Sequence, residues 1–105
     1  MNNQEFSKSV ETALEIVRSR LVVKNQEYAH NSDVFRNFRT GISMQKIPQG
    51  IAWEYMTKHL QWLKDTIADN KLPDMDQVDE KIIDIVNYLL IIRAMYDDQN
   101  NNNLL

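Results

Sequence analysis

Two groups of polar side chains in this chain are of the types that bind phosphates and metal ions. The first group is Lys24, Asn25, Glu27 and Tyr28, which lie within about two turns of a predicted helix. A lysine neutralises phosphate as a point charge, and a tyrosine stacks on a base or donates its hydroxyl. A phosphorylated ligand would suit this group, but Lys24 and Glu27 are equally typical of an ordinary solvated helix surface.

The second group is Glu80, Asp84, Asn87 and Tyr88, near the C-terminus. The spacing of Glu80 and Asp84 puts both carboxylates on one helix face, and such oxygens can hold Mg²⁺ together with phosphate oxygens and water. For Glu80 the simpler interpretation is a solvated acid near a helix N-terminus. Asp84 lies among isoleucines and valine, so its carboxylate is expected to be partly buried and to need a partner.

One of the two histidines, His59, follows Lys58 on a predicted helix between these two groups. An imidazole can bind a metal or act as a base, although a lone helical histidine is more often hydrogen-bonded and structural. The sequence contains no glycine-rich phosphate loop and no His/Cys zinc motif.

Hydrophobic periodicity predicts that helices position these residues. The chain has only two glycines and two prolines, all outside the periodic stretches. We predict a first helix over about residues 4–28, a short one over 34–40, and a third over about 49–70. The last begins at an Asp74 cap, with Gln77 three residues later, and ends near residue 97.

The apolar stripes indicate which faces are buried. In the first helix the stripe is Phe6, Val10, Ala13, Val17 and Leu21, and in the third it is Trp53, Met56, Leu60, Leu63 and Ile67. The last helix is apolar on several faces. It is therefore expected at the centre of a bundle or in a subunit interface.

The 105 residues fit one domain. We predict an all-α fold, a compact and oligomeric bundle of three long helices plus one short helix, over residues 1–98. Residues 99–105 include four consecutive asparagines and are predicted to be a disordered polar tail.

Composition excludes several classes of function. The formal net charge of −3 argues against binding to duplex nucleic acid. The lack of cysteine excludes disulfides and thiolate metal sites. No apolar run approaches membrane-spanning length, and the polar N-terminus does not resemble a signal peptide. We expect a cytoplasmic protein with no membrane partner.

Four segments together resemble a known group of proteins. They are Lys24-Asn25-x-Glu27-Tyr28, Phe35-x-Asn37-Phe38, Lys58-His59 and Glu80-x-x-x-Asp84-x-x-Asn87-Tyr88. This pattern resembles the phage-borne nucleotide modification associated helical domains. Those domains are similar in layout to the MazG-like all-α NTP pyrophosphatases and the all-α dimeric dUTPases.

The resemblance implies a nucleotide-binding helical bundle, often with Mg²⁺ and often oligomeric, placed in the host cytoplasm if phage-encoded. By position, Glu27 and Asp84 would be catalytic and metal carboxylates, with Glu80 as a further metal ligand. Ligand contacts would come from the remaining matched residues, Lys24, Asn25, Tyr28, Asn37, Phe38, Lys58, His59, Asn87 and Tyr88.

The chain departs from the pyrophosphatase pattern where acids are expected. Thr57, three residues after Glu54, occupies the position of the expected second acid. The spacing from Glu80 to Asp84 is one residue longer than the spacing of the acid pair in that pattern. Metal-assisted phosphoanhydride cleavage needs several carboxylates. The sequence thus predicts a nucleotide-binding protein with at most weak Mg²⁺-dependent pyrophosphohydrolase activity. The alternatives are a non-catalytic protein that sequesters an immune signalling nucleotide, and a helical oligomerisation or protein-interaction module.

Overall fold

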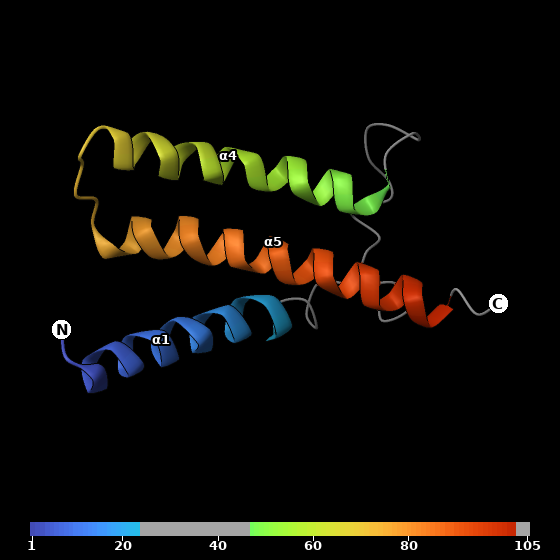
Figure 1. The fold of residues 1–105 in the computed structure, drawn as a ribbon, viewed down its shortest axis with the longest axis horizontal. Helices are drawn as coiled ribbons and strands as arrows, with labels where there is room; N and C mark the ends of the chain where they lie inside the picture. Colours follow the sequence, from blue (N-terminus) through green and yellow to red (C-terminus); the bar gives the residue numbers. More distant parts are fainter. Residues whose placement is uncertain (24–46, 103–105) are drawn as a thin grey trace.

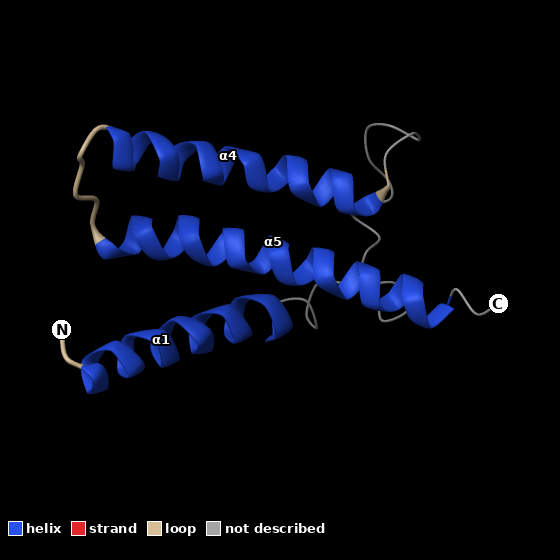
Figure 2. Ribbon diagram, in the orientation of Figure 1, coloured by secondary structure: helices blue, strands red, loops and turns tan. Residues whose placement is uncertain are grey.

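The computed structural model of the chain describes residues 1–23 and 47–102, and in this part helices are joined by loops and turns, without strands (Figure 2). It consists of α1 (Asn3–Arg18), a π-helical turn η1 (Ser19–Val23), α4 (Pro48–Ala68) and α5 (Met75–Asn102). The all-α prediction is confirmed for these residues. The predicted short helix over 34–40 lies outside them.

Capping groups set the start of each long helix. The Asn2 side chain accepts a hydrogen bond from the Glu5 amide at 2.8 Å, and the Asp74 carboxylate accepts one from the Gln77 amide at 2.9 Å. Pro48 occupies the first turn of α4, where a missing N–H costs nothing. All three starts were predicted from the sequence.

A tight turn joins α4 to α5. Asn70 takes a left-handed conformation (φ 54°), and the Lys71 amide donates to the Thr66 carbonyl at 3.1 Å. This is the pattern of a helix end closed by a residue just past its C-cap, a position where asparagine is tolerated. Pro73 then prevents the helix from continuing, so α5 returns antiparallel to α4.

The helix α5 lies between α4 and α1, side by side with both (Figure 1). Its central place agrees with the breadth of its apolar surface. The radius of gyration is 16.2 Å, against about 13 Å for a compact domain of this length. The protein is therefore more extended than the compact bundle that we predicted. None of the described helices is long and apolar enough to cross a membrane.

The core lies mainly between α4 and α5, where Ala52, Met56 and Met95 are almost completely buried. The stripe predicted for α4 is only partly buried: Met56 is inside, but Trp53 and Ile67 are more than half exposed. The reason is a rotation of the helix. Ala52 and His59, each one residue before a stripe residue, face α5, and one residue turns a helix by about 100°.

The helix α5 also continues beyond the end predicted near residue 97, through Asn102. The first residue of the predicted tail, Gln99, bonds to the buried Gln49 at the start of α4. Gln49 Nε2 donates to Gln99 Oε1 at 2.6 Å, and Gln99 Nε2 donates to Gln49 Oε1 at 3.2 Å. This paired amide bridge joins the last turns of α5 to the start of α4.

We expect Gln99→Ala to lower the free energy of unfolding by about 1–3 kcal/mol, because it leaves the buried Gln49 amide without a partner. Urea denaturation followed by circular dichroism measures the change. In the double variant Gln49→Ala/Gln99→Ala no amide is left unpaired, so its loss should be smaller than the sum of the two single losses. Strict additivity would show that the bridge contributes nothing.

Candidate functional site

The predicted site residues fall into two sets. Those on the first polar segment and the predicted short helix lie outside the described residues, namely Lys24, Asn25, Glu27, Tyr28, Asn37 and Phe38. The others lie on α4 and α5. Whether the two sets converge around one ligand is therefore still a prediction.

Three of the predicted residues meet where α4 packs on α5, and a fourth, Asn87, is adjacent in sequence to one of them. His59 Nε2 of α4 lies 3.7 Å from the Asp84 Oδ2 of α5, and the His59 ring lies 6.0 Å from that of Tyr88, one turn further along. Asn87 precedes Tyr88 on the same helix. Residues 25 or more positions apart in the sequence are thus neighbours, because the antiparallel hairpin brings the middle of α4 against the middle of α5.

A fifth member, Tyr55, was missed by the sequence analysis. Its ring lies 6.3 Å from that of Tyr88, with 47° between the ring planes. Tyr55 and His59 are four residues apart and so share one face of α4. This spacing was visible in the sequence, but it identifies a site only once the partner helix is known. We call Tyr55, His59, Asp84, Asn87 and Tyr88 the α4–α5 polar cluster.

The cluster contains two polar atoms with unused hydrogen-bonding capacity. Asn87 Oδ1 and His59 Nδ1 are shielded from solvent and have no hydrogen-bond partner among the described residues. A buried polar atom without a partner costs about 1–3 kcal/mol, and nearly all such atoms in folded proteins are paired. Asn87 Oδ1 is an acceptor, so it calls for an N–H or O–H donor.

Burial, the nearby Asp84 carboxylate and the Tyr55 phenol together raise the pKa of Tyr88 above its ordinary value of 10.0. All three effects disfavour the negative phenolate. Tyr88 therefore keeps its proton at neutral pH and offers a hydroxyl donor beside an aromatic surface.

We expect the delayed ionisation of Tyr88 to appear in an alkaline titration followed by tyrosinate absorbance. Since the unfolded state loses this proton near pH 10 and the folded state only at higher pH, folding stability should fall as the pH rises above 10. Tyr88→Phe should remove both the late absorbance step and this part of the loss. Tyr96→Phe, on the same helix, is the control and should leave both unchanged.

Two other predicted residues, Lys58 and Glu80, lie on these helices outside the cluster. Lys58 is exposed on α4. Glu80 is exposed on α5, and its carboxylate lies 3.9 Å from Lys81 Nζ. Lys81 in turn lies 6.0 Å from the centre of the Trp62 ring. Glu80 thus has a cation beside it already, as a solvated surface acid would.

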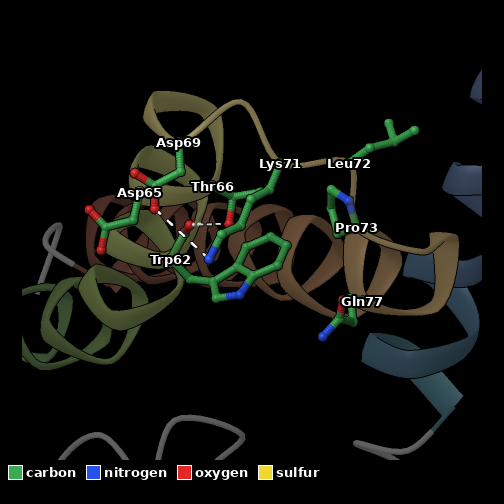
Figure 3. Close-up of a pocket in the computed structure, with 8 residues that line it drawn as sticks. All are labelled: Trp62, Asp65, Thr66, Asp69, Lys71, Leu72, Pro73 and Gln77. Atoms are coloured by element: carbon green, nitrogen blue, oxygen red, sulfur yellow. Dashed lines mark hydrogen bonds and ion pairs between the residues drawn. The ribbon is translucent and has the colours of Figure 1, made fainter.

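Two of the hollows that described residues line contain no predicted site residue. One, of about 480 Å³, lies at the α4–α5 turn beneath Trp62 and Pro73 (Figure 3). Its Lys71 is already paired with Asp69 at 3.9 Å. The other, of about 330 Å³, lies between α1 and the start of α5, next to Ile16 and Asp79.

The cluster offers recognition groups: two phenol rings, an imidazole, a carboxylate and an amide. In the described part of the chain no three acidic or histidine side chains gather as ligands of one metal ion, and the predicted ligand Glu27 lies outside it. The Mg²⁺ prediction is therefore neither supported nor tested by this geometry. Comparison of the chain with family models, curated proteins and solved structures finds no match to any of them.

Proposed function

We propose that the α4–α5 polar cluster forms part of a binding site for a nucleotide. The observation that supports this most directly is the buried Asn87 Oδ1, which has no hydrogen-bond partner among the described residues and belongs to the residue that precedes Tyr88 on α5. The amino or imino groups of a nucleobase supply the donor that this acceptor lacks. The same base presents a flat surface to aromatic rings, a contact worth about 1–3 kcal/mol per base.

The remaining groups suit the charged end of such a ligand. The Asp84 carboxylate repels phosphate unless a cation lies between them, and protonated His59, 3.7 Å away, is one such cation. Mg²⁺ bound to both Asp84 and the phosphates is another. In this proposal Lys24 and Lys58 contact the phosphates, and Glu27 adds a further oxygen to the metal.

The test is a thermal-shift and calorimetric screen of the full chain. Ribonucleotides, deoxyribonucleotides and cyclic nucleotides are each tried with and without Mg²⁺. A ligand that binds only the folded state stabilises it by RT ln(1 + [L]/Kd), and so raises the melting temperature. We expect at least one nucleotide class to stabilise the wild-type protein. If no nucleotide does so under either condition, the proposal is wrong.

Binding and cleavage are separated by analysing the recovered ligand. In the proposed function hydrolysis is at most weak, so pyrophosphate should be released slowly and only with Mg²⁺ or Mn²⁺. Tight binding with the nucleotide recovered intact would instead favour the sequestering alternative, in which the protein removes a signalling nucleotide from solution.

A further inference from the structure

We infer that the α4–α5 polar cluster selects a base with an exocyclic amino group over a base with a carbonyl oxygen at the same position, and that His59 takes part in this selection. The inference rests on the proposed function and adds to it the class of base. It depends on two buried hydrogen-bond acceptors, one on each helix, for which the described residues supply no donor.

The first acceptor is His59 Nδ1. The other ring nitrogen, Nε2, lies 3.7 Å from Asp84 Oδ2, whereas Nδ1 is shielded from solvent and has no partner in the described part of the chain. A carboxylate only accepts hydrogen bonds, so it favours a proton on Nε2. In the neutral imidazole Nδ1 then carries a lone pair and accepts.

This tautomer is the less costly arrangement of the ring. A second proton would turn Nδ1 into a charged donor that is shielded from solvent and unpaired, and a charge in that position costs more than a neutral acceptor. With the neutral ring, Mg²⁺ rather than His59 is the cation that the proposed site needs between Asp84 and the phosphates.

The second acceptor is Asn87 Oδ1, which is also shielded and unpaired among residues 1–23 and 47–102. Both acceptors belong to neighbours of Tyr88: the His59 ring lies 6.0 Å from the Tyr88 ring, and Asn87 precedes Tyr88 in the sequence. A base that stacks on the Tyr88 ring is therefore close to both residues that lack a donor.

Two acceptors distinguish between bases because they require two N–H groups. The amino group of adenine, cytosine or guanine carries two hydrogens. Uracil, thymine and hypoxanthine have a carbonyl oxygen in place of such an amino group and only one N–H on the ring. A carbonyl oxygen facing a buried acceptor leaves both atoms unpaired, so a site of this kind rejects the base that bears it.

The experiment is calorimetric titration of the full chain, with Mg²⁺, using pairs of nucleoside triphosphates that differ in one amino group. The pairs are adenosine and inosine, guanosine and inosine, and cytidine and uridine triphosphates. We expect the amino member of at least one pair to bind about 10- to 100-fold more tightly than its partner. Equal binding within every pair, or a preference for the carbonyl member, overturns the inference and leaves the proposed nucleotide site standing. If no nucleotide binds at all, the proposed function fails and the inference fails with it.

His59→Phe tests the role of the imidazole, since it keeps an aromatic ring at this position and removes the acceptor. It should reduce the preference within the pair by weakening the binding of the amino member, and an unchanged preference would exclude His59 from base selection. The matched control is Gln61→Leu, which removes an exposed polar side chain from α4 outside the cluster. Its preference should equal that of wild type.

A second measurement needs neither nucleotide nor a variant of His59. Nitrogen-15 NMR of the histidine rings reports which nitrogen carries the proton, and His30→Gln leaves His59 as the chain's one histidine. His59 should show a protonated Nε2 and an unprotonated Nδ1 in the free protein at neutral pH. A proton on Nδ1 would make that atom a donor and overturn the inference, whether or not His59→Phe folds.

Discussion

Met56→Ala is expected to lower the free energy of unfolding by about 2–5 kcal/mol, a large part of the stability of a small domain. Met56 is only 1% exposed on α4, so removal of its side chain leaves a cavity in the buried core. Urea unfolding, followed by the loss of the helical circular dichroism signal, measures the change in stability.

The matched control is Met75→Ala. Met75 has the same side chain, but it is 65% exposed at the start of α5, and alanine is the better helix former. This variant should change stability by no more than about 0.5 kcal/mol. Equal losses in the two variants would mean that the α4–α5 interface is not the stable core of the protein.

The second large effect concerns ligand binding. If the polar cluster binds a nucleotide, Asp84→Asn should weaken that binding by about 10- to 100-fold, which corresponds to losing one hydrogen bond or cation contact of a charged group. The substitution keeps the size of the side chain and removes its charge. Calorimetric titration of the nucleotide found in the screen gives the affinity directly.

Asp97→Asn is the control for a general effect of charge, since it removes one carboxylate from the same helix at an exposed position outside the cluster. Its affinity should match that of wild type. His59→Gln should weaken binding in the same direction as Asp84→Asn, and the double variant should lose less than the sum, because the two groups act together. If Asp84→Asn binds the nucleotide with wild-type affinity, then Asp84 is not part of the binding site.

The sequence by itself determined the local structure: that the described segments are helices, and where they start. Helix starts depend on a few neighbouring residues, such as the Asn2 and Asp74 caps and Pro48, so they can be predicted without a partner helix. The breadth of the apolar surface of α5 likewise predicted a place at the centre of a bundle or in a subunit interface, and α5 lies between α4 and α1. The end of α5 was mispredicted because Gln99 is held by Gln49, fifty residues away.

Only the tertiary structure decided which faces meet. The apolar stripe of α4 is real, yet its outer members Trp53 and Ile67 are exposed, because packing chose the neighbouring line through Ala52 and His59. Periodicity defines a stripe wider than one contact, and a rotation of about 100° within it changes little in local energy. The same rotation brought His59 to Asp84 and added Tyr55 to the cluster, since a contact between distant residues depends on how two helices pack.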